Sequence, residues 1–303
     1  MRTEEISRQA KVSNAAETCV VCGTPVLDRV RVRLDSSQLR ECSSCGTWVY
    51  FPRPQAAEQA AIHDTEDYFE HPYFELRRRS GEAQLRRCRQ IIAHLTLDRG
   101  TDFFRGQRLL DIGCDTGLFL TTAAKEFGVQ PIGVDVGARA VAVAARQGIE
   151  VYRASLETAP ESLHELAAIT AIDLIEHLSD PAAFLREIRK RLRPGGVVYL
   201  ETPNIRSTVY AAGRVLSRMT GGWPAPLYQR LFPAQHIQYF TRSSLAALAN
   251  ACGLELARMG TRVLPWDDIA ASGLVRAGMA GMQTLDRISG EQILIWAVLR
   301  RPA

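Results

Sequence analysis

The sequence predicts an α/β protein in which a doubly wound, mostly parallel sheet of seven strands follows a small cysteine-rich module. Three observations lead to this prediction. Short apolar runs alternate with helical patterns from residue 108 onward, which is typical of strands joined by crossover helices. A glycine-containing turn, Gly113-Cys-Asp-Thr-Gly117, joins the first of these strands to its helix. Two Cys-x-x-Cys pairs lie upstream of residue 46.

Length and composition are those of a soluble globular protein. The chain has 303 residues, enough for one large domain and a small one, and 46% of them are hydrophobic. No apolar run approaches the roughly 20 residues that a membrane span needs, and the first residues carry no signal-peptide core. The formal net charge of +4 is small for this length. We therefore expect a cytoplasmic protein with neither a membrane nor a nucleic acid as partner.

The cysteine-rich module is predicted to be a zinc ribbon over residues 18–54, after a polar tail (1–17) that is predicted to be disordered. Its ligands would be Cys19, Cys22, Cys42 and Cys45, because two Cys-x-x-Cys pairs at this separation are typical of a tetrahedral Zn²⁺ site. With four thiolates the ion would be structural. The alternating segment 26–39 supplies a β-hairpin between the two pairs. Four cysteines without a metal are the alternative.

Residues 55–100 are interpreted as a linker and a helical cap. Four aromatic residues between positions 67 and 74 could pack over the cofactor or line the substrate entrance, or they could bury a domain interface, and the sequence favours neither explanation. An amphipathic helix is expected over 75–95. Its pair Arg86 and Arg87 could meet phosphates, but a solvated helix face is the commoner explanation.

The main domain, 101–303, begins with a strand and turn suited to a nucleotide. Gly113 and Gly117 let the backbone approach a ligand, and Asp135 ends the next strand 22 positions after Gly113 (135 − 113), where doubly wound folds place an acid for ribose hydroxyls. NAD and S-adenosylmethionine are both candidates. The dinucleotide pattern Gly-x-Gly-x-x-Gly fails, because Asp115 and Leu118 occupy its second and third glycine positions.

The turn instead resembles the first motif of class I S-adenosylmethionine-dependent methyltransferases, Asp/Glu-x-Gly-x-Gly-x-Gly, with Asp111 in first place. The sequence departs from it at Asp115, where the family usually has glycine. A carboxylate there could face the ammonium group of the cofactor's methionine part or cap the helix. The runs Glu176-His-Leu-Ser-Asp-Pro181, Leu192-Arg-Pro-Gly-Gly196 and Glu201-Thr-Pro-Asn204 are similar to ubiquinone-type and to natural-product and sugar methyltransferases.

The resemblance covers about residues 105–255 and implies a Rossmann-like fold that binds S-adenosyl-L-methionine. The loop 154–157 is expected to close over the adenine. The residues expected to contact the cofactor are Asp111, Gly113, Cys114, Asp115, Gly117, Asp135, Val136, Ser155, Leu156 and Asp173.

The remaining elements follow in order. Strands are expected at 131–135, 150–153, 168–175, 197–201, 254–263 and 292–299, with helices at 138–147, 181–192, 241–251 and 266–289. Residues 205–240 form an insertion after the fifth strand, irregular as far as residue 234, that could act as a substrate lid.

The leading hypothesis for function is methyl transfer to oxygen, carbon or nitrogen of a small molecule in a biosynthetic pathway. His177 and His236 are the candidate general bases for the acceptor's proton. Two alternatives remain. Asp173, Glu176 and His177 resemble the Glu-x-x-Glu-His with which ubiquinone-type enzymes hold a divalent ion such as Mg²⁺, although Asp173 is the shorter acid. His177 could also be a structural residue bonded to a backbone carbonyl.

Two other classes of function are considered. Some RNA methyltransferases carry a cysteine-rich zinc module before this fold, but the segment 19–45 balances Asp28, Asp35 and Glu41 against four arginines and is not strongly basic. A non-catalytic binding protein would not need the complete set of cofactor residues. The sequence specifies neither the acceptor nor the oligomeric state.

Overall fold

The computed structural model describes residues 18–24, 29–34, 37–54, 81–97, 99–221, 223, 228, 231–264 and 273–303. Several expectations therefore lie outside the described residues: the tail 1–17, the aromatic run 67–74, parts of the insertion around 222–230, and the start of the helix expected at 266. None of the helices in the described ranges combines the length and the apolar character that a membrane crossing requires.

The larger sheet has seven strands in the order β10-β11-β8-β7-β4-β5-β6, which confirms the predicted doubly wound α/β fold. Strands β4 to β8 are parallel, and β11 runs antiparallel to both β8 and β10. The last strand of the chain therefore lies inside the sheet rather than at its edge. The bounds are β4 Arg108–Ile112, β5 Gln130–Asp135, β6 Glu150–Arg153, β7 Leu166–Ile172, β8 Leu192–Pro203, β10 Glu255–Arg262 and β11 Leu294–Arg300.

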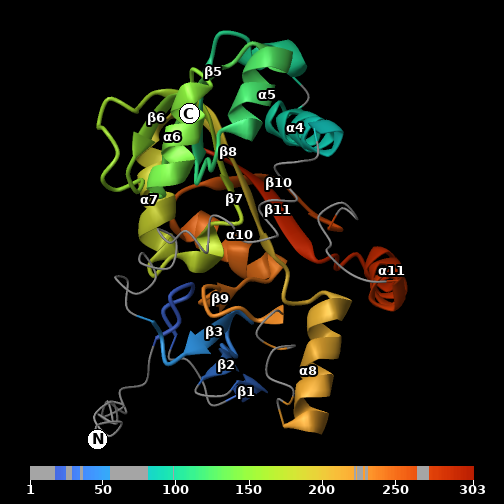
Figure 1. Ribbon diagram of the computed structural model, residues 1–303. Coiled ribbons are helices and arrows are strands. Elements are labelled where there is room, and N and C mark those ends of the chain that lie inside the picture. The colour runs from blue at the N-terminus through green and yellow to red at the C-terminus, as the bar shows by residue number, and fades with distance from the viewer. Residues whose placement is uncertain are drawn as a thin grey trace, which may run out of the picture.

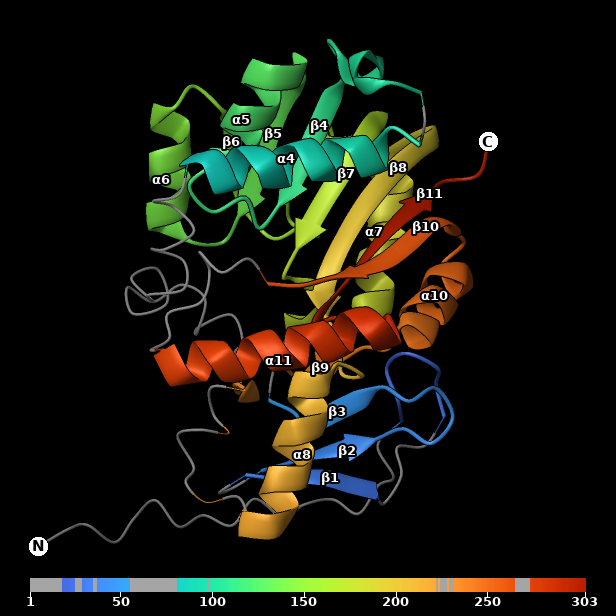
Figure 2. The same cartoon turned by 90° about the vertical axis from the view of Figure 1, so that its right-hand side faces the viewer.

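Helices cover both faces of this sheet, and each face has its own core (Figure 2). Helices α4 (Gly81–Leu95), α5 (Leu118–Phe127) and α6 (Ala138–Arg146) share a core with Leu109 and Tyr199. Helices α7 (Pro181–Arg191) and α10 (Arg242–Ala251) share the other with Leu110 and Val198. Neighbouring strand residues enter opposite cores because side chains alternate across a sheet.

Two helix starts follow the sequence signals closely. Asp180 precedes α7 and its carboxylate accepts a hydrogen bond from the Ala183 N–H at 2.8 Å, with Pro181 in the first turn. Thr241 caps α10 in a reciprocal capping box with Ser244. These caps fix where each helix begins.

A second sheet of four antiparallel strands contains the cysteine-rich module, in the order β1-β2-β3-β9. Strands β1 (Arg29–Arg33) and β2 (Gln38–Glu41) form the predicted hairpin, and β3 (Trp48–Phe51) adds to it. The fourth strand, β9 (Gln238–Tyr239), comes from far along the chain. Figure 1 shows it between the blue module and the larger sheet.

Residues 208–220 were expected to be irregular, and that expectation is wrong. They form helix α8 (Thr208–Thr220), which lies beside β1 to β3 (Figure 2). Tyr210 on α8 shares a buried core with Val32 and Trp48 of the module. The helix is stabilised by this long-range packing, which local sequence patterns do not reveal. A further helix, α11 (Gly273–Ser289), precedes β11.

A half-buried histidine on α4 provides a test of pH dependence. The His94 ring stacks on Trp296, with 3.8 Å between centroids. Burial and the nearby Arg258 charge lower the pKa of His94 from 6.5, against a smaller opposing effect of Glu201. The unfolded chain therefore takes up this proton first as the pH falls. The stability that His94 contributes is present above about pH 6.5 and is lost as the pH falls through its lowered folded pKa.

We expect His94→Phe, which keeps a ring against Trp296, to flatten that part of the pH dependence. The measurement is the thermal unfolding midpoint of wild type and variant between about pH 7.5 and pH 5. The wild-type midpoint should fall further over this window than that of the variant. Parallel curves would mean that His94 has no part in the pH dependence.

Candidate active site

The turn between β4 and α5 has the strained backbone that a ligand-cradling turn requires. Gly113, Asp115 and Gly117 all have positive φ, at 74°, 47° and 77°. At Gly117 a Cβ would lie 2.4 Å from Ile149 Cδ1, so a side chain there would collide with the core beneath α6. Asp115 tolerates the left-handed conformation better than most residues, which explains how it replaces the family's usual glycine. It does not cap α5, whose N-cap is Gly117 without a side-chain bond.

Asp135 lies beside this turn at the end of β5, as predicted. Its carboxylate accepts hydrogen bonds from the Asp115 N–H at 2.9 Å and the Gly137 N–H at 2.8 Å, one on each oxygen. Each carboxylate oxygen has two lone pairs, so hydroxyl groups of a ligand can add to these bonds. Val136 next to it is 40% exposed. The structure therefore brings Asp135, Asp115 and Val136 together at the carboxyl ends of β4 and β5.

Two of the predicted cofactor residues direct their side chains into the protein. Asp111 is buried and accepts a hydrogen bond of 2.6 Å from the Thr170 hydroxyl on β7. Cys114 is buried against Gly133, and burial together with the Asp111 charge raises the pKa of its thiol above the ordinary range. These side chains support the turn from below. Only the backbone of Cys114 can approach a ligand.

The loop after β6 lies next to Asp135, since the Ala154 N–H donates to the Asp135 carbonyl at 3.0 Å. Ser155 forms a turn with Thr158, and Leu156 is buried in the core. The guanidinium of Arg191 donates to the Leu156 carbonyl at 2.9 Å and fixes the loop from the α7 side. Backbone atoms of this loop are therefore held beside Asp135 and the β4–α5 turn, and closure of the loop over the adenine stays a prediction.

A buried network of charges lies at the ends of β7 and β8. Glu201 is fully buried and receives hydrogen bonds from Arg87, Arg262 and the Tyr199 hydroxyl. Asp173, with φ at 53°, donates its N–H to the Glu201 carbonyl and lies 3.6 Å from the Arg87 guanidinium. Asp173 therefore contacts this network, and it directly follows β7 at the strand ends where the cofactor is expected.

Arg87 was interpreted as part of a solvated helix face, and for this residue the interpretation is wrong. The Arg87 side chain is only 9% exposed and bonds Glu201 at 2.6 Å. A signal for this was present in the sequence. Arg87 precedes the buried Ile91 and Leu95 at intervals of four, so it lies on the apolar stripe of α4. Arg86, one position earlier, is exposed as expected.

Glu176, His177 and His236 form a cluster in which one ligand atom from each lies within 4.8 Å of the others. His177 Nδ1 lies 2.9 Å from the Gln235 carbonyl oxygen, which assigns the ring proton to Nδ1 and makes Nε2 the atom for chemistry. The alternative in which His177 is a structural residue requires a bond to a backbone carbonyl, and the Gln235 carbonyl provides that bond. The two predicted histidines, 59 positions apart (236 − 177), face each other with ring centroids at 4.8 Å.

Glu176 is the buried acid of this cluster. One carboxylate oxygen accepts from the Thr202 hydroxyl at 2.8 Å, and the other, Oε1, has no hydrogen-bond partner among the described residues. Burial, then the charge of Asp173, raises the pKa of Glu176 well above its ordinary value. Asp173 is not a member of the cluster. The three donors that converge, two imidazoles and one carboxylate, suit a first-row transition metal better than Mg²⁺, which prefers oxygen.

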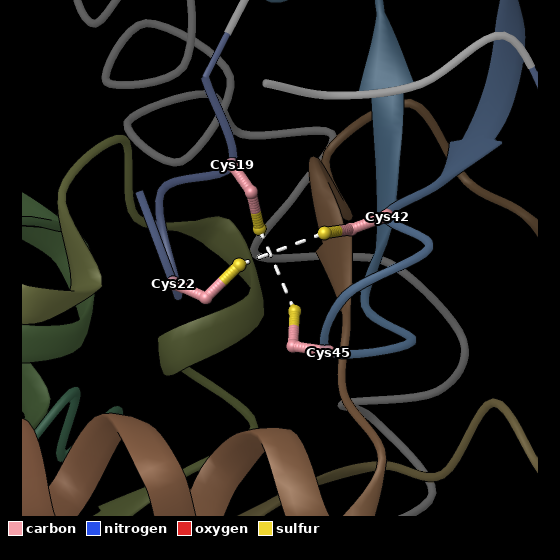
Figure 3. Close-up of side chains that lie close together, drawn as sticks. All are labelled: Cys19, Cys22, Cys42 and Cys45. Carbon is pink, nitrogen blue, oxygen red and sulfur yellow. Dashed lines mark hydrogen bonds between the residues drawn. The ribbon is translucent and has the colours of Figure 1, made fainter. Parts of the chain in front are cut away.

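The four predicted zinc ligands converge, with their sulfur atoms pointing toward one another (Figure 3). The Cys19–Cys45 and Cys22–Cys42 Sγ distances are 3.7 and 3.6 Å. Four sulfurs around a tetrahedral Zn²⁺ with Zn–S of about 2.3 Å would be about 3.8 Å apart. The sulfur positions therefore fit a zinc ion, and they are much too far apart for disulfides.

Comparisons with known proteins agree with this geometry. A family model described as a methyltransferase domain matches residues 81–258, more than half of the chain. A ubiquinone biosynthesis O-methyltransferase from Idiomarina loihiensis is 29% identical over 187 residues, which cover 59% of this chain and 69% of the relative.

Solved structures resemble the fold. The phosphoethanolamine N-methyltransferase 2 of Haemonchus contortus, in complex with S-adenosyl-L-methionine, matches with a TM-score of 0.54 and 18% identity, over 84% of this chain and 63% of that one. The geranyl diphosphate C-methyltransferase of Streptomyces coelicolor A3(2) matches with a TM-score of 0.52 and 14% identity, over 82% and 88%. At these identities the likeness concerns the fold alone.

Proposed function

This chain belongs to the class I S-adenosylmethionine-dependent methyltransferases, and we propose that it methylates a small-molecule acceptor at the edge of the sheet where β4, β5, β7 and β8 end. The observation that carries the proposal is the Glu176–His177–His236 cluster, on segments that follow β7 and β8 at the same edge as the cofactor turn. Open α/β sheets bind ligands at this edge, where the strand order reverses. The ubiquinone-biosynthesis relative supports a small molecule as the acceptor.

The proposed cofactor site consists of the β4–α5 turn, the Asp135 carboxylate and the 154–157 loop. Asp135 would accept hydrogen bonds from the ribose hydroxyls, and the first amides of α5 would point toward the ligand because they lack partners within the helix. S-adenosylmethionine supplies an electrophilic methyl on sulfur. The chain's task is to hold an acceptor about 3 Å from that methyl, in line with the sulfur–carbon bond, and to exclude water.

His177 and His236 are the proposed bases. A hydroxyl acceptor must lose its proton as the new bond forms, and a neutral imidazole can take it near neutral pH. Because His177 donates from Nδ1, its Nε2 lone pair is the acceptor of that proton. In the metal-assisted alternative, Glu176, His177 and His236 would be the ligands, and Asp173 would not be one of them. Mg²⁺ would be a poor match for this site, because it prefers oxygen ligands and the two histidines offer nitrogen.

The test is methyl transfer from labelled S-adenosylmethionine to a metabolite extract and to total RNA. We expect label in a small molecule, and His177→Ala or His236→Ala should lower turnover at least about tenfold, or about 1.4 kcal/mol of barrier. If only RNA is labelled, the acceptor is RNA and not a small molecule. If turnover requires an added divalent metal after EDTA treatment, the metal-assisted mechanism replaces the histidine base.

We also propose that the cysteine cluster holds one structural Zn²⁺, with Cys19, Cys22, Cys42 and Cys45 as ligands. The purified protein is expected to contain about one zinc per chain, and Cys42→Ser should lose it. Elemental analysis is the measurement. Cys252→Ser is the matched control, because this buried thiol bonds the Ala182 carbonyl and belongs to no metal cluster among the described residues. Finding iron in place of zinc, or no metal at all, would contradict the assignment.

A further inference from the structure

Strand β9 connects the cysteine-rich module to the histidine cluster. On one side it pairs with β3, with Trp48 opposite Tyr239 and Val49 opposite Gln238. The Tyr50 N–H extends the pairing by donating to the Ile237 carbonyl at 2.9 Å. Because β9 has only two residues, it cannot be stable without a partner strand. The position of β9 therefore depends on β3.

The other contacts of β9 hold the cluster. The Ile237 N–H donates to the Glu176 carbonyl at 3.1 Å, and His236 immediately precedes it. The side-chain amide of Gln238, which is fully buried, donates to the Ile175 and Leu178 carbonyls at 2.9 and 3.0 Å. Ile175 begins the short 3-10 turn η2 (Ile175–His177), which presents Glu176 and His177, and Leu178 directly follows it. One buried side chain thus fixes both ends of the catalytic turn.

The two cysteine pairs also share a buried core with this region. Cys19 and Cys42 belong to the same core as Ile175, which precedes Glu176, and Phe240, which follows β9. Trp48 of β3 and Tyr239 of β9 share a second core, and the Tyr239 ring contacts that of His236 at 5.6 Å between centroids. The turn between β4 and α5 is held by local bonds instead: the Gly113 and Cys114 N–H groups donate to the Val134 carbonyl at 2.8 and 3.2 Å, and its Cys114 and the adjacent Leu120 belong to the core on the α4–α6 face.

We propose that the metal-loaded module is a positioning element of the acceptor site, acting through β3, β9 and Gln238 on the geometry of Glu176, His177 and His236. The inference rests on the proposed function for the role of the cluster and of the zinc. Zinc binding contributes folding free energy to the module, so metal loss removes the partner strand of β9. Cofactor binding should persist, because the backbone bonds of the β4–α5 turn go to Val134 and Asp135 and not to the module.

The first test compares wild type, Cys42→Ser and the control Cys252→Ser by hydrogen exchange and by titration of S-adenosylhomocysteine. Loss of the metal is expected to raise exchange at least about tenfold in 174–178 and 235–239, with 112–118 unchanged and cofactor affinity within about twofold. Unchanged protection of 235–239 in a metal-free variant would overturn the proposal. Absence of cofactor binding by the wild type would instead refute the proposed function.

Gln238→Met keeps the zinc ligands and the strand, so it tests the coupling even if Cys42→Ser fails to fold. We expect it to retain its metal, to raise exchange in 174–178, and to lower kcat at least about tenfold with the KM for S-adenosylmethionine within about twofold. Gln283→Met is the matched control, because Gln283 is a buried glutamine on α11 whose amide donates to the Leu264 carbonyl. Equal exchange in the two variants would show that Gln238 has no positioning role.

Discussion

Asp135→Ala is expected to lower the affinity for S-adenosylmethionine at least about 100-fold. A hydrogen bond to a charged group contributes about 1.5–3 kcal/mol, and the carboxylate is proposed to accept two from the ribose. The variant also removes the bonds to the Asp115 and Gly137 amides at 2.9 and 2.8 Å, so the turn loses its own support. Both effects reduce binding in the same direction.

Titration calorimetry with S-adenosylhomocysteine gives the comparison. Asp135→Asn keeps the shape and one acceptor oxygen, so its affinity should lie between wild type and Asp135→Ala. Asp102→Ala removes an equal charge from an exposed position and should bind as wild type does. An affinity for Asp135→Ala within about threefold of wild type would remove Asp135 from the cofactor site.

Glu201→Leu is expected to destabilise the fold by about 3–5 kcal/mol, because it leaves Arg87 and Arg262 near each other in the interior without their shared carboxylate. The side chain of Glu201 is fully buried, so water cannot replace the lost acceptor. Leucine has a similar volume, which keeps cavity formation a minor part of the effect.

Urea unfolding of wild type, Glu201→Leu and Glu255→Leu measures this cost. Glu255 pairs with Arg300 at the surface, where both side chains are about half exposed, and its loss should cost less than about 1 kcal/mol. Adding Arg87→Met to Glu201→Leu should recover part of the stability, since one uncompensated charge is removed. Equal unfolding free energies for the two single variants would show that the buried network contributes nothing specific.

The local parts of the site could be predicted from the sequence because short-range geometry determines them. The spacing of Gly113 and Gly117 after an apolar strand predicted the tight turn between β4 and α5, and Asp135 lies beside it at the end of the next strand; that they bind the cofactor stays a prediction. The four cysteines occur as two adjacent pairs, and each pair folds as one tight turn. The caps at Asp180 and Thr241 also lie within three residues of the groups they bond.

Contacts between distant segments were harder to predict. His177 and His236 were each proposed, but that Glu176 rather than Asp173 completes their cluster depends on the 3-10 turn and on β9. Helix α8 was not predicted, because its buried side chains pack against the cysteine-rich module, which is distant in the sequence. Burial of Arg87 depends on Glu201, 114 positions away.

The sequence by itself determined the fold class, the glycine turn between β4 and α5 and the two close cysteine pairs, since periodicity and residue spacing express covalent geometry over a few residues. Only the tertiary structure decided that the fourth strand of the module's sheet is β9, and that this strand also holds the η2 turn with Glu176 and His177. Strand pairings of this kind depend on the burial of complementary surfaces from distant parts of the chain. A strand of only two residues also has no local sequence pattern that would predict its partner.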